Sequence, residues 1–210
     1  MFILDKFHWR YATKKFDPAR RIPERQLHLL TEAIRLAPSS YGLQHYRLLV
    51  ITDETIRQQL ASAAWNQPQL LEASHVLLFA AETRIDETFV KDNIDLMATT
   101  RGVERETLAG WESMIMDGIR LRSHGEVMLN WAQKQAYIGL GVAVSVAAEM
   151  GIDSCPMEGF DVKEFDRILH LGEENLTATV LLPVGYRAAD DMYVQLPKVR
   201  RPEAQFLIYH

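Results

Sequence analysis

The sequence predicts an α+β or α/β fold, in which helices cover a central sheet. Segments with helical periodicity outnumber the apolar runs that are typical of buried strands. Dipeptides that favour tight hairpin turns are scarce, which argues against an all-β protein. The chain has 210 residues, of which 48% are apolar, so we expect one domain, 1–210, with a sizeable core.

Five segments have apolar residues at helical spacing. They are 23–37, 53–64, 86–130, 131–150 and 161–169. Pro38 ends the first segment, and Asp53 or Thr55 is the expected N-cap of the second. The fourth is the most apolar, contains many small residues, and is followed by Gly151 as a C-cap. We therefore expect this helix at the centre of the core or at a subunit interface.

Four apolar runs have the length of buried strands. They are 48–52, 76–81, 178–185 and, near the C-terminus, 205–209. The longest apolar stretch, 136–150, is shorter than the roughly 20 residues of a bilayer-spanning helix, so no membrane span is expected. Charged residues begin at Asp5, too early for a signal-peptide core. Cys155 is the only cysteine, and a chain without an internal disulfide suits a cytoplasmic location.

Two short basic segments, 10–17 and 198–201, lie at opposite ends of a chain with a formal net charge of -5. The negative total argues against general nucleic-acid or anionic-membrane binding. If the fold brings the two ends together, their cations can hold a small anion such as phosphate. Arg10 and Lys14 would share one face if the first segment were helical. The alternative is a pair of solvated surface segments. The candidate ligands are Arg10, Lys14, Lys198 and Arg200.

Two loops are candidates for contact with a flat ligand. Segment 37–44 follows a helix and contains small hydroxyls, a proline and a glycine, so it is either a helix stop or a ligand-binding loop. Segment 155–160 precedes a helix and offers the consecutive amides of Glu158 and Gly159 to an electron-rich atom. It is otherwise a plain connection. Cys155 has no partner base in an evident motif, so we interpret it as buried structure rather than as a nucleophile.

Several chemistries are not indicated. The seven histidines lack the spacing of metal-ligand pairs, so no metal site is expected. The sequence contains neither a G-x-S-x-G motif nor a P-loop, and it has no Gly-rich dinucleotide fingerprint. A nicotinamide cofactor held in a Rossmann fold is therefore not expected.

Taken in order, these segments resemble the FMN-dependent nitroreductase family over nearly the whole chain. The matching motifs are RYATKKFD at 10–17, APSSYGLQ at 37–44, NQPQ at 66–69 with EASH at 72–75, GIDSCPMEGFD at 151–161, VGY at 184–186 and KVR at 198–200. The resemblance implies a homodimer with a central mixed, mainly antiparallel sheet covered by helices. It also implies a C-terminal segment that extends onto the partner, and FMN at the interface.

The resemblance implies a role for each motif. Arg10, Tyr11, Ala12, Lys198 and Arg200 would bind the FMN phosphate, and Lys14 would lie near the ribityl chain and the N1–O2 edge. Lys15 and Arg201 would be surface charges. Asn66 and Gln69 would pair with the pyrimidine ring. Pro156, Met157, Glu158 and Gly159 would line the flavin, with the last two amides at N5 and O4. Pro38, Ser39, Ser40 and Gly42 would come from the partner subunit.

Three positions depart from the family pattern. Ala12 stands where a hydroxyl is usual, which removes one phosphate hydrogen bond. Gly42 stands where close bacterial members often have Asn, and Gln69 where they have Lys. A neutral Gln69 would stabilise an anion at N1 less than a lysine does and would lower the flavin potential.

The implied activity is that of an oxidoreductase. It would use NADH or NADPH to reduce nitroaromatics, quinones or related electron-poor acceptors by a ping-pong two-electron mechanism. Flavin N5 would carry the chemistry, without a catalytic side chain. Alternatives on the same scaffold are reductive dehalogenation, flavin reduction or flavin breakdown. A flavin-binding protein without turnover and a helical interaction protein without cofactor also remain open.

Overall fold

The computed structural model describes residues 3–123 and 126–210. At its centre lies an antiparallel four-stranded sheet with the strand order β1-β2-β4-β3. The strands are β1 Tyr46–Ile51, β2 His75–Glu82, β3 Asp153–Ser154 and β4 Leu176–Gly185. An isolated parallel bridge between Ala12 and Ser154 adds the N-terminal segment to the edge of the sheet. The sheet is therefore mainly antiparallel, as expected.

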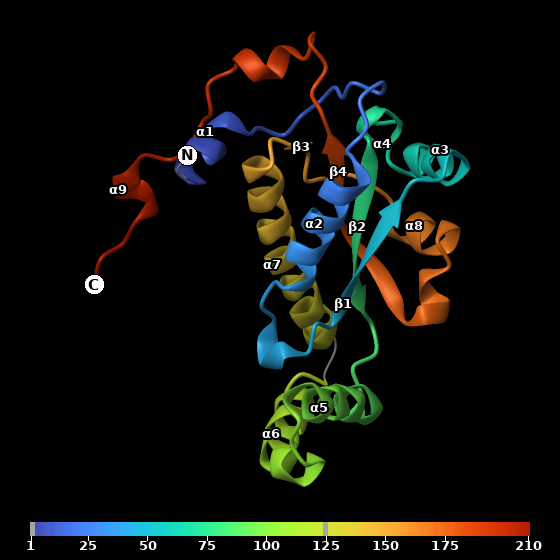
Figure 1. Ribbon diagram of the computed structural model, residues 1–210, viewed down its shortest axis with the longest axis vertical. Helices are drawn as coiled ribbons and strands as arrows, with labels where there is room; N and C mark the ends of the chain where they lie inside the picture. Colours follow the sequence, from blue (N-terminus) through green and yellow to red (C-terminus); the bar gives the residue numbers. More distant parts are fainter. Residues whose placement is uncertain (1–2, 124–125) are drawn as a thin grey trace.

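Helices cover both faces of this sheet (Figure 1). The α-helices are α1 Ile3–Trp9, α2 Glu24–Arg35, α3 Glu54–Ala63, α4 Gln69–Glu72, α5 Glu87–Arg101, α6 Ala109–Arg120, α7 Val127–Glu149, α8 Val162–Ile168 and α9 Glu203–Phe206. Short 3-10 turns occur at Ser40–Gly42, Arg105–Leu108, Leu171–Glu174 and Met192–Gln195. In the part of the chain described, no helix has both the length and the apolar character needed to cross a membrane.

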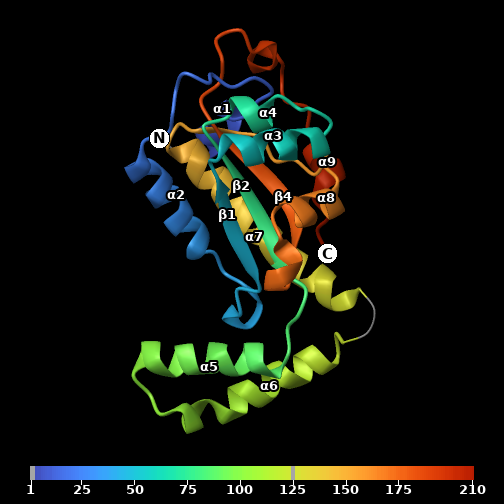
Figure 2. The ribbon, with the colours of Figure 1, turned by 90° about the vertical axis from the view of Figure 1, so that its right-hand side faces the viewer.

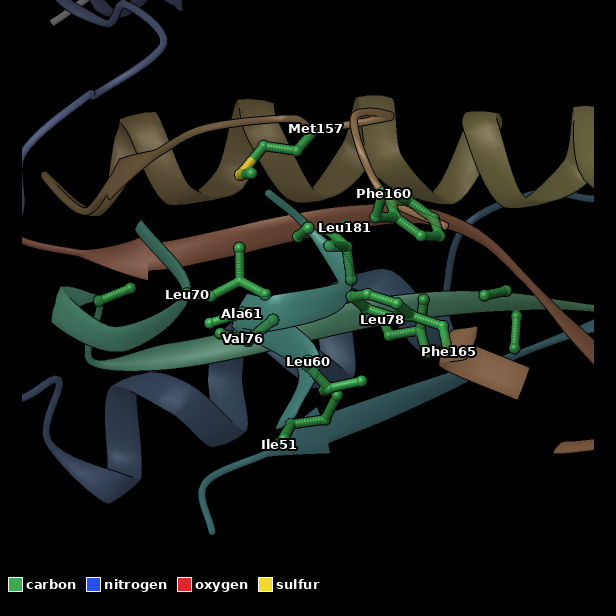
Figure 3. Close-up of a cluster of buried hydrophobic side chains, with 14 of the residues drawn as sticks. Ile51, Leu60, Ala61, Leu70, Val76, Leu78, Met157, Phe160, Phe165 and Leu181 are labelled. Atoms are coloured by element: carbon green, nitrogen blue, oxygen red, sulfur yellow. The ribbon is translucent and has the colours of Figure 1, made fainter. Parts of the chain in front are cut away.

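Strand β2 is buried along its whole length and divides the core into two layers. Val76 and Leu78 point into a cluster with α3, α4 and α8, whose side chains are drawn in Figure 3. Leu77 and Phe79 point to the other face, where α2 and α7 pack. This alternation follows from the two-residue period of a strand. An uninterrupted apolar run is therefore what a strand covered on both sides requires.

Helices α5 and α6 project from one end of the sheet (Figure 2). A third buried cluster joins them to the start of α7 through Ile94, Ile115 and Trp131. Gly102 ends α5 in the left-handed region, with φ 64°, which a glycine adopts without strain. The predicted helical segment 86–130 is thus divided between two main helices. Its residues 124–125 lie outside the described part of the chain.

The predicted helix boundaries agree with the structure within a few residues. Asp53 is the N-cap of α3 and accepts a hydrogen bond from the amide of Ile56, as expected. Gly151, with φ 69°, follows the last turn of α7. Helix α1 had no counterpart among the predicted elements. It has seven residues, none of them buried, and it lies against α7.

One structural prediction is wrong. Residues 205–209 do not form a strand, because α9 takes up residues 203–206 and no described strand lies beside them. The whole segment 192–210 is exposed, and Figure 1 shows that it leaves the body of the subunit. The condition under which Arg10 and Lys14 would share a helical face is not met, since α1 ends at Trp9 and the bridges of Ala12 and Phe16 belong to extended backbone.

Candidate functional site

The two basic ends of the chain meet in the folded subunit. Burial lowers the pKa of Arg10, and the charge of Arg200 lowers it further. The pKa of Lys198 is lowered by burial and then by the charges of Arg10, Arg200 and Arg187. Lys198 also donates a 2.7 Å hydrogen bond to the carbonyl oxygen of His8, at the end of α1. The cations predicted from opposite ends thus lie close enough to repel one another.

Within this cluster one guanidinium nitrogen lacks a partner. Nε of Arg10 is buried and has no hydrogen-bond acceptor among the described residues. A buried donor without a partner costs free energy that a bound anion would recover. A cavity of about 520 Å³ lies against Arg200 and is also lined by Val199, Arg201 and Phe206. The cluster therefore has both the charge and the space for an anionic group.

Arg187 is a cation of this region that the sequence did not single out. Its guanidinium donates from Nε to Oδ1 of buried Asp153 at 2.8 Å. It also lies 4.4 Å from the ring centroid of Trp9 and 4.6 Å from that of Tyr11. These contacts fasten the N-terminal segment to strand β3. An isolated arginine after a strand gives no sequence signal, because its partners are distant along the chain.

Asp191 is the second residue that the sequence did not reveal. Its side chain accepts hydrogen bonds from the hydroxyl of Tyr11 at 2.8 Å and from the amide of Lys14 at 3.0 Å. Its neighbour Asp190 instead pairs with Lys15 at the surface. Lys15 is therefore a surface charge, as expected.

Cys155 marks the point where three predicted motifs converge. Burial raises the pKa of its thiol, and this effect is opposed by the charge of Lys14, a hydrogen bond with Gln69 and the charge of Arg10. Groups from segments 10–14, 66–69 and 155–159 therefore surround one buried side chain. Cys155 is 1% exposed, which fits the interpretation of a structural residue.

Gln69 carries a buried, unused acceptor at this place. The residue is 4% exposed, and no described residue donates to its Oε1. A buried amide oxygen is normally satisfied. Asn66 lies nearby in the chain but is exposed, with φ 54°. Of the two predicted pyrimidine contacts, Gln69 thus has an unsatisfied atom.

The loop 155–159 runs beside β4 and then turns away from it. Cys155 and Met157 donate their amides to Pro183 and Leu181, at 3.1 Å and 2.9 Å. The following amides of Glu158 and Gly159 have no acceptor among the described residues. The carbonyl oxygen of Gly159 accepts a 2.7 Å hydrogen bond from Gln67. The loop thus presents two adjacent backbone donors, while its bonds to β4 and to Gln67 hold it in place.

The loop with Pro38, Ser39, Ser40 and Gly42 lies away from these groups. Figure 1 shows it at the far end of α2, and a helix of 12 residues is about 18 Å long. The amide of Ser40 donates to Oε1 of Gln135 at 2.9 Å, and Ser39 Oγ accepts from the amide of Gln44 at 2.9 Å. Gly42 has φ 71°. No described hydrogen bond joins this loop to segments 10–17, 66–69, 155–159 or 198–200.

The remaining motifs form a site with two parts. One part is a cluster of cations that suits a dianionic group, and the other offers adjacent backbone donors and an amide acceptor that suit a flat heterocycle. Within the described residues, no group of three or more His, Cys, Asp or Glu side chains could hold a metal ion.

Comparison with known proteins gives one family. The family model described as "Nitroreductase family" matches residues 8–186. A Staphylococcus epidermidis protein that is provisionally named an NAD(P)H nitroreductase is 34% identical over 210 residues. The alignment covers 96% of this chain and 93% of that protein.

Solved structures share the fold. A provisionally named nitroreductase of Bacillus subtilis superposes with a TM-score of 0.84 at 20% identity, over 99% of this chain and 98% of that one. A provisionally named nitroreductase of Exiguobacterium sibiricum, solved in complex with FMN, has a TM-score of 0.82 at 19% identity. It covers 100% of this chain, which covers 98% of it.

Proposed function

The chain belongs to the nitroreductase family, and from this we propose that it is an FMN-dependent oxidoreductase that takes electrons from NADH or NADPH. Its acceptors would be nitroaromatics, quinones or related electron-poor compounds. The observation that carries the proposal is the meeting of Arg10, Lys198 and Arg200, with Arg10 close to Cys155 at the start of the loop 155–159. Homologues with NAD(P)H nitroreductase names and a structural neighbour in complex with FMN support it.

The residues present fit the phosphate end of FMN. Three cations repel one another in the subunit, and Nε of Arg10 lacks an acceptor. A phosphate dianion would remove the repulsion and accept from that donor. The amides of Tyr11 and Ala12 have no described acceptor, so they can contribute although Ala12 lacks a hydroxyl.

The residues also fit the ring of FMN. The unused Oε1 of Gln69 can accept from the N3–H of the pyrimidine, and Asn66 would contribute from the segment before α4. The free amides of Glu158 and Gly159 can donate to N5 and O4. Pro156 and Met157 would line the ring. Lys14 would place a cation near the N1–O2 edge. Its charge lowers the pKa of Cys155, so it lies near this thiol.

A homodimer would complete the site. In this proposal the partner contributes Pro38, Ser39, Ser40 and Gly42, which lie far from the other motifs within one subunit. The exposed segment 192–210 would extend onto the partner, where its apolar side chains become buried. The fold 1–210 would then act as one FMN-binding domain in the cytoplasm, where a chain with a single cysteine needs no disulfide.

The bound cofactor would supply two-electron transfer at N5. The protein would bind the phosphate, hold the ring through Gln69 and Asn66, and orient N5 with two backbone amides. Its contribution is position and electrostatics. Nicotinamide and acceptor would use the same open face in turn, which is a ping-pong scheme.

A visible spectrum of the purified protein tests the proposal most directly. We expect a yellow protein whose absorbance bleaches under anaerobic addition of NADH or NADPH and returns with a nitroaromatic or quinone. Initial-rate lines at several acceptor concentrations should be parallel. A colourless protein that binds no added FMN would overturn the proposal, and intersecting lines would reject exchange at one shared face.

Two outcomes would point to the alternatives. Bound flavin that neither nicotinamide bleaches would indicate a flavin-binding protein without turnover. Turnover with halogenated acceptors alone, or with free flavin alone, would indicate another reaction on the same scaffold.

A further inference from the structure

We propose that Asp191 is a positioning residue that assembles the anion site and thereby selects FMN over riboflavin, the same flavin without its phosphate. The inference rests on the proposed function, because the anion concerned is the phosphate of FMN. Asp191 would act through the backbone segments that carry the cations, without touching the ligand.

One carboxylate joins the two ends of the chain. From the N-terminal segment, Oδ2 accepts the hydroxyl of Tyr11 at 2.8 Å and the amides of Lys14 and Lys15 at 3.0 and 3.2 Å. From the C-terminal segment, Oδ1 accepts the amide of Tyr193 at 3.1 Å. These four donors use about the full accepting capacity of a carboxylate.

Asp191 is buried and ionised. The residue is 3% exposed. Burial by itself raises the pKa of Asp191, but the hydrogen bonds from Tyr11 and from the amides of Tyr193, Lys14 and Lys15 outweigh it and leave the pKa below its ordinary value. A buried carboxylate is costly unless its donors stay in place, so these bonds resist displacement of either segment.

The position of Asp191 explains how like charges remain gathered. Arg10 lies one residue before Tyr11, and Lys198 and Arg200 follow Tyr193 on the exposed segment 192–210. Their mutual repulsion favours dispersal of the two segments. None of the described hydrogen bonds of Asp191 goes to these three cations. The carboxylate therefore holds the backbone that follows Arg10 and the start of the segment that carries Lys198 and Arg200, and none of these three cations is paired with it.

The experiment compares two flavins and a free anion. Apoprotein is titrated with FMN and with riboflavin, followed by flavin fluorescence, for the wild type, Asp191→Ala and Asp191→Asn. The thermal midpoint of each apoprotein is also measured with and without inorganic phosphate. Asp190→Ala is the matched control, because Asp190 is exposed and pairs with Lys15 outside the site.

We expect Asp191→Ala to raise the Kd for FMN by about tenfold to a hundredfold, the size of losing one or two charge-assisted hydrogen bonds. The Kd for riboflavin should change by less than about threefold in the same variant. The stabilisation of the apoprotein by phosphate should disappear. Asp191→Asn should lie between, since its amide oxygen still accepts, and Asp190→Ala should match the wild type.

Three results would overturn the inference. The first is an Asp191→Ala variant that keeps wild-type affinity for FMN. The second is an equal loss of FMN and riboflavin affinity in both Asp191 variants, with stabilisation by phosphate retained. That pattern would mean that Asp191 supports the fold without affecting the anion site. The third is a wild type that binds neither flavin, which would remove the proposed function as well and is thereby distinguishable from the other two.

Discussion

The hydroxyl of Tyr137 donates a 2.6 Å hydrogen bond to Oε1 of Glu158. This bond ties the middle of α7 to the loop that presents the free amides of Glu158 and Gly159. Burial, and then the hydrogen bond and charge of Glu158, raise the pKa of Tyr137 to about 12. The tyrosine therefore keeps its proton, and remains a donor, throughout the range in which the protein would work.

Replacing Tyr137 by Phe removes this bond alone. Because Tyr137 is 39% exposed, we expect the free energy of unfolding to fall by only about 1 kcal/mol. A folded-state pKa above the unfolded value of about 10 means that the contribution is complete below pH 10 and fades as the pH rises toward 12. Denaturant unfolding at pH 6 and pH 9 should thus show the same loss. A loss that differs between these pH values would contradict the assignment.

Because His45 is buried, we expect the protein to lose stability in acid. Its ring is fully buried, neither ring nitrogen has a described partner, and it lies 4.0 Å from the ring centroid of Trp131. Burial, and then the charge of Arg122, lower the pKa of His45 to about 4. The folded state therefore binds fewer protons than the unfolded state below pH 6.5. Stability should be constant above pH 6.5 and fall by up to about 3 kcal/mol as the pH drops toward 4.

The variant His45→Phe isolates this effect, because it keeps an aromatic ring on Trp131 and removes the titrating group. Unfolding midpoints of the two proteins should diverge between pH 6.5 and pH 4, with the variant less sensitive to acid. Exposed His28→Gln should follow the wild type. Parallel curves for wild type and His45→Phe would show that His45 does not titrate in this range.

Arg200 and Arg201 are adjacent and form a matched pair. The charge of Arg200 lowers the pKa of Arg10 and of Lys198, whereas Arg201 is expected to be a surface charge. Replacing Arg200 by Ala should weaken FMN binding by about tenfold or more, as expected when a charged hydrogen bond is lost. Arg201→Ala should have little effect in the same titration. Equal losses of FMN affinity in the two variants would contradict a phosphate site that contains Arg200.

Gly139 and Gly141 test the close approach of α7 to the sheet. An added Cβ at Gly139 would lie 2.6 Å from the hydroxyl of Tyr46, whereas at Gly141 nothing lies within 4 Å. Gly139→Ala should therefore lower the free energy of unfolding by about 1–3 kcal/mol. Gly141→Ala should be neutral or raise it by up to about 1 kcal/mol, through helix propensity. Destabilisation of similar size in both variants, measured by denaturant unfolding, would show that another surface packs against Gly141.

The fold was largely predictable because its core follows simple periodicities. The runs at 48–52, 76–81 and 178–185 became β1, β2 and β4. Strand β2 is buried throughout and β4 over most of its length, and such strands have to be apolar, whereas the edge strand β1 is only partly buried. Residues 205–209 are similarly apolar but form no strand. Their apolar side chains are exposed in the subunit, and composition alone does not distinguish burial in a sheet from contact with another surface.

The site was predictable only where the residues carry a local pattern. The basic segments and the loop 155–160 have distinctive sequences, and the structure brings Arg10, Lys198 and Arg200 together. Asp191 and Arg187 have no such pattern. Each contacts the N-terminal segment, more than a hundred residues away in the chain, so only the folded structure reveals them.

The position of Asp191 at the end of the buried part of the chain has a consequence for variation. The residues after it, 192–210, are exposed, whereas the sheet and its two apolar layers are complete before it. If Lys198 and Arg200 bind an anion as proposed, substitutions in the final segment would alter that affinity while leaving the core untouched. Part of the charge of the proposed anion site would thus be free to change without affecting the core, whereas the part from Arg10 and the buried loops would not.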